Sequence, residues 1–354
     1  MYHFTTASLE NCSPMTLPPL ISARSLGGMP EFAEHAIGAR ALGRAMAQAG
    51  LPSRLIEDRA GYIPEDALAT FVDQLGRGVG DENIGLLWAP ALTVRDYGVW
   101  GDHVLCAPTL GEALTWAQSA MPFHSSADRT TWHADTEHLY YSYNFGLKQH
   151  PAYPAIAYSA LGSVLSIFRH YLGSGFRPAC IKCDFTHSGH SEAAEEVFGC
   201  PIYWDSDRLE IGFDRRLLKQ RKHGGYGRVI TIEDVRRDRS KLMPRNMSDL
   251  VSLMLHLRSD SDRKSLESIA EDLDLGPRTV QRRLAQEDTS FREVMKLHSI
   301  QRAKELLAHG GLSVTQIATE IGFTSQSNFS RAFRKQVGLS PSEFAQNCKP
   351  AFPR

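Results

Sequence analysis

The feature that most constrains the fold of this chain is a pair of short helices joined by a glycine-containing turn, a pattern that occurs twice in the C-terminal part. In the first copy, Asp274-Leu275-Gly276 ends one helix and Pro277 opens the next, at a position where the missing N–H of proline costs nothing. Val280 and Leu284 are predicted to face inward. The helix before the turn has an apolar stripe at helical spacing: Leu266, Ile269, Ala270 and Leu273. This pattern predicts a helix-turn-helix unit.

The second copy begins about 50 residues later with a capping box of Ser313 and Gln316. Gly322-Phe323 turns the chain, and Thr324 or Ser325 is expected to cap the following helix. The inward positions of this copy are Ile317, Ala318, Ile321, Phe329, Ala332 and Phe333. A single helix over Ser290–Leu307, roughly 25 Å long, is predicted to join the two units. The sequence therefore predicts an all-α C-terminal domain with two helix-turn-helix units and a linker helix.

The balance of acidic and basic residues also differs between this C-terminal part and the rest of the chain. The 354 residues have a formal net charge of −1, which taken alone argues against nucleic acid as a partner. Residues 1–240, however, hold 22 basic and 27 acidic residues, whereas the remainder holds 17 and 13. The predicted organisation is a flexible tail over 1–19, a first domain over 20–215, a basic glycine-containing linker over 216–247, a second domain over 248–348 and a tail over 349–354.

The first domain is predicted to be α+β. Apolar residues recur at helical spacing in Phe32–Ala49, Pro64–Leu75 and Thr109–Ala120, and Thr109 with Glu112 has the pattern of a helix start. Strand alternation is found in Glu137–Phe145 and Pro178–Phe185. In the first strand, Leu139, Tyr141, Tyr143 and Phe145 are expected to share one face. In the second strand, Ile181, Cys183 and Phe185 are expected to share one face.

The outward faces of the second helices are built from residue types that are able to hydrogen-bond to DNA bases. Arginine pairs with guanine, glutamine or asparagine pairs with adenine, and serine or threonine bonds several base edges. Two such units on a rigid helix would place their reading helices about one DNA turn apart, ~34 Å. A pair of ordinary amphipathic hairpins with solvated arginine faces is the plain alternative, and the duplication argues against it.

These residues resemble the signature of the AraC/XylS family of bacterial transcriptional regulators. The resemblance extends from Asp249 to Gln346 and rests above all on Ile317-Ala318, Ile321-Gly322-Phe323, Ser327, Phe329-Ser330-Arg331-Ala332-Phe333, Gly338, Ser340-Pro341 and Phe344. It implies a seven-helix domain that binds promoter DNA. By position, the implied contacts are Arg278, Thr279, Gln281 and Arg282 in the first unit and Gln326, Ser327, Asn328 and Arg331 in the second. Gly276, Asp288 and Ser299 depart from the family's usual residues.

The first domain is similar to the arabinose-binding-like sensor domain of one branch of that family, which includes ornithine-utilisation regulators. The similarity covers Pro30–Leu218 and rests on Tyr97-Gly98, Ala107 to Leu114, Phe185 with His187, and Phe198 to Ile202. It implies effector sensing and dimerisation. The expected partners are promoter DNA, a small-molecule effector, a second copy of the chain, and RNA polymerase if the protein is an activator.

Four residues of the first domain are candidate effector contacts: Trp100, His103, His124 and Tyr141. Aromatic side chains can line a pocket and histidines can contact a ligand, although packing in a core is the more common role of each.

No metal, cofactor or catalytic residue is predicted. Cys180 and Cys183, with His187 and His190 downstream, have residue types that bind zinc, but strand alternation places the two thiols on opposite faces. The motifs of serine hydrolases, phosphate loops, dinucleotide folds and zinc proteases are absent from the sequence. The chain also lacks a secretory leader pattern and an apolar run of membrane-spanning length, so a cytoplasmic location is expected.

Sequence-specific transcription regulation under effector control is therefore the predicted function. The alternatives are an enzyme domain tethered to nucleic acid by a helical module, and a ligand-independent architectural DNA binder.

Overall fold

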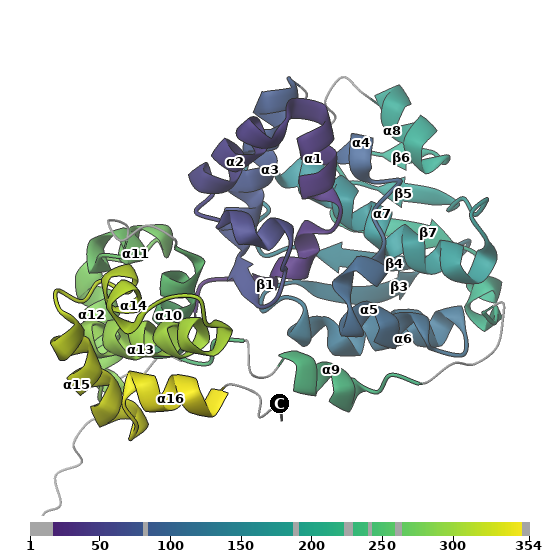
Figure 1. Ribbon diagram of the computed structural model, residues 1–354. Coiled ribbons are helices and arrows are strands. Elements are labelled where there is room, and N and C mark those ends of the chain that lie inside the picture. Colours follow the sequence, from purple (N-terminus) through teal and green to yellow (C-terminus); the bar gives the residue numbers. More distant parts are fainter. Residues whose placement is uncertain are drawn as a thin grey trace, which may run out of the picture. The chain divides into compact units, whose positions relative to one another are not determined.

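The computed structural model describes residues 17–80, 84–186, 191–222, 229–239, 243–258 and 264–348. Its contacts divide it into two compact units, one from Pro19 to Met243 and one that begins at Pro244. Figure 1 shows the first unit as sheet and helix together and the second as helices. The predicted fold class, an α+β domain followed by an all-α domain with two helix-turn-helix units, is confirmed.

The N-terminal unit contains two sheets. Its strands are β1 (Leu20–Ser22), β2 (Tyr62–Pro64), β3 (Arg129–Ala134), β4 (Leu139–Asn144), β5 (Cys180–Lys182), β6 (Ile202–Tyr203) and β7 (Leu209–Phe213). β1 and β2 form an antiparallel pair, with Ile21 opposite Ile63. The larger sheet has the order β3-β4-β7-β5-β6, in which β5 and β6 run parallel and the other neighbours antiparallel.

Strand β4, which lies between β3 and β7, is buried on both faces, which alternation alone does not predict. Tyr141 and Tyr143 belong to the main core, as expected. On the other face, the ring of Tyr140 stacks on His133 at 4.7 Å, and Ser142 Oγ donates a hydrogen bond of 2.6 Å to Glu210. Neighbouring strands therefore cover the polar face of β4 with their own side chains. Of the second predicted strand, Pro178–Phe185, only the residues of β5, Cys180–Lys182, form a regular strand.

Helices surround these sheets (Figure 1). They are α1 (Met29–Ile37), α2 (Ala39–Gln48), α3 (Glu65–Val79), α4 (Ile84–Trp88), α5 (Val99–Leu105), α6 (Leu110–Ala120), α7 (Tyr153–Leu172), α8 (Ser191–Phe198) and α9 (Ile232–Arg239). The helical pattern over Phe32–Ala49 is divided into α1 and α2 by Gly38, whose φ of 80° breaks the helix. Thr109 caps α6 by accepting a bond from Glu112 N, as predicted.

Helix α7 forms the centre of this unit because small residues let it approach its neighbours closely. A Cβ built on Gly162 would lie 2.2 Å from the Ala89 carbonyl oxygen, and one on Gly85 would lie 2.1 Å from the Ala155 carbonyl oxygen. Neither position can accept a side chain without moving backbone. The two glycines thus fix how α4 and the chain that follows it pack on α7.

The C-terminal unit contains seven helices in its described residues, the number that the family resemblance implies. They are α10 (Met247–Leu257), α11 (Leu266–Asp272), α12 (Pro277–Gln286), α13 (Phe291–His309), α14 (Val314–Glu320), α15 (Gln326–Val337) and α16 (Pro341–Cys348). Ser313 and Gln316 form the predicted capping box, and Ser325 rather than Thr324 caps α15. The predicted linker helix is α13, capped by Ser290.

The cores of the two helix-turn-helix units follow the predicted stripes. Val280 and Leu284 are fully buried in the first unit, and Phe329 and Phe333 are fully buried in the second, with ring centroids 5.6 Å apart. Burial of such side chains stabilises the fold by about 1.5 to 3 kcal/mol each. Because the inward positions of α12 and α15 are fixed in this way, their polar faces point outward.

Candidate nucleic-acid interface and acidic cavity

Helix α12 presents its predicted reading residues on the surface. Arg278, Gln281 and Arg282 are exposed, and Thr279 is half-buried near the start of the helix. Gly276 precedes Pro277 as N-cap and has no side chain to accept a hydrogen bond, so the N–H of Arg278, the first in the helix, receives no cap from that residue. Such a helix start suits both phosphate oxygens and base edges.

Helix α15 exposes all four of its predicted residues, Gln326, Ser327, Asn328 and Arg331. Gln326 accepts a 2.7 Å bond at Oε1 from Thr315 Oγ1 of α14, which orients the amide and leaves its N–H groups pointing elsewhere. Arg331 Nη2 donates to Asn328 Oδ1 at 2.7 Å. These contacts hold the side chains in place before any nucleic acid binds.

Polar contacts fix α12 within the first unit. Glu287, just after α12, accepts bonds from Met247 N at 2.7 Å and Ser248 N at 2.9 Å, and so satisfies the open N–H groups of α10. Arg258, at the other end of α10, forms an ion pair with Asp272 of α11 and donates to Ser268 O at 2.9 Å. Both helices of the first unit are therefore anchored to α10.

The turns of this unit explain one departure from the family pattern. Asp288 stands where the family often has glycine, and its φ is 53°, in the left-handed region that glycine adopts most easily. Asparagine and aspartate tolerate this region better than most residues. The substitution therefore keeps the turn between α12 and α13.

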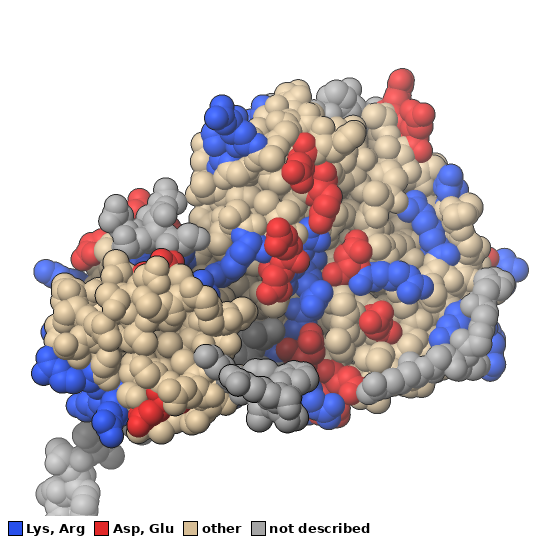
Figure 2. Space-filling model, viewed as in Figure 1, with Lys and Arg blue, Asp and Glu red and all other residues tan. Residues whose placement is uncertain are grey.

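Basic side chains gather on the reading side of the C-terminal unit. Figure 2 shows Lys and Arg along the edge where Figure 1 places α12 and α15. On α15, exposed Arg334 and Lys335 follow Arg331. Such charges attract DNA phosphates regardless of sequence, whereas the forked side chains choose bases. The surface has both of the parts that sequence-specific DNA binding needs.

The four candidate effector residues lie in the packed interior of the N-terminal unit. Trp100 donates from Nε1 to Ala120 O at 2.9 Å, and Tyr141 packs edge-on against Trp132. The ring of His103 stacks at 4.9 Å on Trp116. None of the four lines the cavity described next.

His124 is also enclosed. Its Nε2 lies 3.3 Å from Ser25 Oγ, and its ring packs on Tyr97 and Trp100. Burial lowers the pKa of His124 to about 3, so the imidazole is neutral at physiological pH. All four side chains therefore have partners within the protein, and the effector-contact assignment stays a prediction.

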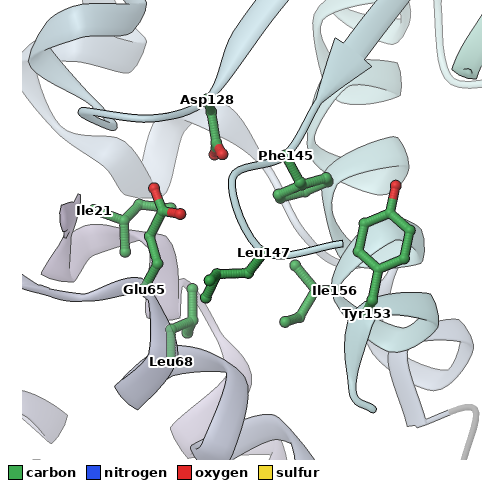
Figure 3. Close-up of a pocket in the computed structure, with 8 residues that line it drawn as sticks. All are labelled: Ile21, Glu65, Leu68, Asp128, Phe145, Leu147, Tyr153 and Ile156. Atoms are coloured by element: carbon green, nitrogen blue, oxygen red, sulfur yellow. The ribbon is translucent and has the colours of Figure 1, made fainter. Parts of the chain in front are cut away.

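A small cavity, open to solvent, lies elsewhere in the N-terminal unit, with about 20 Å³ of free space, enough for about one water molecule. Figure 3 shows two carboxylates at one end and mostly apolar side chains around the rest. The lining residues are Ile21, Glu65, Leu68, Asp128, Phe145, Leu147, Tyr153 and Ile156. They come from β1, α3, α7 and the segments before β3 and after β4.

The two carboxylates are held by a short hydrogen-bond network. Ser125 Oγ donates to Glu65 Oε1 at 2.6 Å and accepts from Asp128 N at 2.8 Å. Asp128 accepts at Oδ2 from the Tyr143 hydroxyl at 2.8 Å and at Oδ1 from Gly146 N at 3.0 Å. Within the described residues, no donor bonds the second oxygen of Glu65, Oε2.

Burial and mutual repulsion shift both carboxyl groups. Burial raises the pKa of Glu65 to about 8, the charge of Asp128 raises it further, and the Ser125 bond opposes the rise. Burial raises the pKa of Asp128 to about 6, against the bonds from Tyr143 and Gly146. At neutral pH the pair therefore holds about one proton and one negative charge.

Sequence reasoning missed this pair. Glu65 follows Pro64 at a helix start, where an acidic residue is expected for the helix dipole alone. Asp128 lies in a short polar segment with no motif. They meet only because the segment containing Ser125 packs against both α3 and β1, and no local pattern in the sequence carries that contact.

The cysteines give no metal site in the described part of the chain, where no group of three or more His, Cys, Asp or Glu is arranged to hold an ion. Cys180, Cys183 and Cys200 are buried free thiols. Burial raises the pKa of each, which keeps the thiols protonated. His187 and His190 lie outside the described residues.

Two family models match the chain. Residues 40–221 match the arabinose-binding domain of AraC transcription regulators, N-terminal, and residues 269–347 match a helix-turn-helix domain. The first match alone covers more than half of the chain. The protein belongs to the AraC family of transcription regulators.

Individual relatives of this AraC-family chain are regulators by name. The HTH-type transcriptional regulator VirS of Mycobacterium tuberculosis is 29% identical over 171 residues, which are 45% of this chain and 48% of VirS. The regulator VqsM of Pseudomonas aeruginosa is 24% identical over 262 residues, 71% of this chain and 80% of VqsM. The regulator Rv1395 of M. tuberculosis is 44% identical over 78 residues, so the match spans only 23% of its length.

Among solved structures, the transcriptional regulator CdpR from P. aeruginosa is similar, with 23% identity, coverage of 87% of this chain and 97% of that chain, and a TM-score of 0.41. Separately, none of the helices in the described part of this chain combines the length and apolarity that crossing a bilayer requires.

Proposed function

We propose that this AraC-family regulator binds promoter DNA through both helix-turn-helix units and that a small molecule in the N-terminal domain controls this binding. The observation that carries the first half is the pair of reading faces on α12 and α15. Each exposes base-reading side chains above a fully buried apolar face. Amphipathic hairpins in general have no need for Arg, Gln and Asn at matched positions of two units.

A route for control runs from β1 to the end of the N-terminal unit. Ser22 of β1 accepts a bond from Arg239, the last residue of α9. Arg239 is 1% exposed and also donates to Tyr97 O at 3.0 Å. Because the C-terminal unit begins at Pro244, a shift of β1 would act on the chain just before that unit.

The segment 216–247, predicted as a linker, contains this helix. α9 packs against the N-terminal unit through Val235 and Arg239. Just before α9, the carbonyl oxygen of Ile230 lies 2.6 Å from Nδ1 of His103. The compact unit therefore extends to Met243, beyond the predicted boundary at 215. The glycine-rich run at 223–227 lies outside the described residues. A ligand that favours one arrangement of α9 over another would shift the balance between them.

Equilibrium gel shifts with DNA selected from a random library test the DNA half of the proposal. Arg331→Ala and Gln281→Ala should each weaken binding to the selected site by about 1 to 3 kcal/mol while changing random-DNA binding little. Arg302→Ala, which removes an exposed charge from α13 outside both faces, is the matched control. Equal losses on selected and random DNA would refute base reading.

The proposal includes a homodimer that forms through the N-terminal domain, on the strength of the family to which that domain belongs. Light scattering at micromolar concentration, with and without DNA, tests it, and a monomer in both conditions would count against it. RNA polymerase is a partner only if bound protein activates transcription, which a reporter assay with the selected site decides. No catalytic role is proposed for either domain.

A further inference from the structure

The two amide side chains at the start of α15 have their carbonyl oxygens bonded within the protein. Gln326 is the first residue of the helix, and its Oε1 accepts the 2.7 Å bond from Thr315 Oγ1 of α14. Asn328, which is exposed on the same helix, accepts at Oδ1 from Arg331 Nη2 at 2.7 Å. Since an amide holds its oxygen and its NH2 group on opposite sides of one planar group, each NH2 group is directed away from the protein donor.

The bond from Thr315 also turns the Gln326 oxygen away from a bound duplex. In a helix-turn-helix unit the second helix lies in the major groove and the first helix crosses outside it, and α14 is the first helix of this unit. An oxygen held against α14 does not face the same base edge as the NH2 group of its own amide. Bidentate pairing with adenine needs both atoms on that edge, because adenine presents one acceptor and one donor there. Gln326 is therefore kept from the pairing that a free glutamine makes.

We propose that Thr315 is a positioning residue that makes α15 a donor-only reading helix, selective for guanine over adenine. The inference rests on the proposed DNA binding and names the base that the second unit selects. The groups that face outward are the NH2 groups of Gln326 and Asn328 and the guanidinium of Arg331. Ser327, the fourth exposed residue, has a hydroxyl that donates as well as accepts. In the major groove guanine offers two acceptors and no donor, whereas adenine and cytosine each offer an NH2 group that would meet another donor.

The bond between Asn328 and Arg331 favours the same base. Arg331 is exposed, and a free arginine side chain in solvent samples many rotamers. The bond from its Nη2 to Asn328 restricts these rotamers before DNA binds. Less entropy is then lost when the remaining N–H groups of the fork pair with guanine O6 and N7.

Helix α12 lacks this arrangement and provides a comparison within the same chain. Its first residue is Pro277, at the position that Gln326 has in α15, and proline has no side-chain group to bond the preceding helix. Gln281 of α12 is exposed, and within the described ranges no protein donor bonds its amide oxygen. That amide keeps both its donor and its acceptor for a base. Adenine should therefore be accepted opposite α12 and disfavoured opposite α15.

Selection of sites from a random DNA library by the full-length protein tests the inference. Gln326→Ala identifies the position that Gln326 reads, because base preference should be lost there and kept elsewhere. In the native protein this position should be guanine, and replacing it with adenine should weaken binding at least about fivefold. Any other base at that position, or a Gln326→Ala variant with native preference at every position, would overturn the inference.

Variants of Thr315 test its positioning role. Thr315→Val removes the hydroxyl and frees the Gln326 oxygen, so the ratio of guanine to adenine affinity at that position should fall at least about fivefold. Thr315→Ser keeps the hydroxyl and should keep the native ratio. Thr319→Val is the matched control, since the exposed Thr319 hydroxyl bonds the backbone of its own helix at 3.2 Å. A native ratio in Thr315→Val, with folding confirmed by circular dichroism, would refute the role of Thr315.

The same selection separates this inference from the proposed function. If no sequence is enriched over random DNA, sequence-specific binding fails and the inference fails with it. If a site is enriched but Thr315→Val selects the same bases as the native protein, sequence-specific DNA binding stands and donor-only reading by α15 fails.

Discussion

The buried carboxyl pair predicts that the N-terminal domain loses stability as pH rises through neutrality. The pKa of Glu65 is about 8 in the folded protein, against an ordinary value of 4.5. The folded state therefore keeps a proton that the unfolded chain has already lost. The stabilising effect of that proton is complete below about pH 4.5 and declines as pH rises, until the folded group itself ionises near pH 8.

The size of the decline follows from this window. Between about pH 5.5 and pH 8 each pH unit corresponds to about 1.36 kcal/mol for one proton, so the N-terminal domain should lose about 3 kcal/mol. Asp128, whose pKa is also raised, adds a decline of the same sign at the acidic end of the window. Glu65→Gln removes the titrating group and should flatten the profile over most of the range.

Urea unfolding followed by tryptophan fluorescence measures this effect in the right domain. All five tryptophans, at positions 88, 100, 116, 132 and 204, lie in the N-terminal unit, so the signal reports on that unit alone. Asp66→Asn, at the adjacent exposed position on α3, is the matched control and should keep the native pH profile. A native protein whose stability is flat from about pH 5.5 to pH 8, or a Glu65→Gln variant with the native slope, would refute the reasoning.

Three further changes test the packing. Replacing Arg239 with Met removes two charge-assisted bonds, each worth about 1.5 to 3 kcal/mol, and should raise hydrogen exchange throughout α9 while α7 stays protected. Native-like exchange in α9 would show that these two bonds do not hold the helix in place. Gly162→Ala forces a Cβ against the Ala89 carbonyl and should lower the free energy of unfolding by at least about 1 to 3 kcal/mol. Gly43→Ala, with open space around it, should instead stabilise α2 by about 0.5 to 1 kcal/mol. Urea unfolding in which both variants change the free energy of unfolding in the same direction would refute this. Phe333→Ala should destabilise the C-terminal unit by about 3 to 5 kcal/mol in calorimetry and leave the unfolding transition detected by tryptophan fluorescence unchanged. If the variant destabilised both transitions, the two units would not unfold separately.

The C-terminal domain could be predicted from sequence because its determinants are local. The capping box of Ser313 and Gln316 and the N-cap Ser290 act within four residues of each helix start, and the apolar stripes repeat at helical spacing. Each signal therefore lies within the element that it specifies. Only the choice between Thr324 and Ser325 needed the structure.

The N-terminal domain depends on contacts between residues far apart in sequence, so local sequence patterns predict less of its structure. Arg239 is in a charged stretch typical of a linker, yet it is buried because Ser22 and the Tyr97 carbonyl, far away in sequence, accept its bonds. Glu65 and Asp128 likewise meet only through tertiary packing. Aromatic residues such as Trp100 are natural ligand candidates, but sequence alone does not separate that role from packing in a core, which needs the same properties.

The central claim is that one chain reads DNA with two separate helices, and guanine protection on the selected site tests it most directly. The native protein should protect two major-groove segments about one helical turn, ~34 Å, apart. Arg282→Ala should remove guanine protection in one segment and Arg331→Ala in the other. A single protected segment, or loss of the same bases in both variants, would contradict the account.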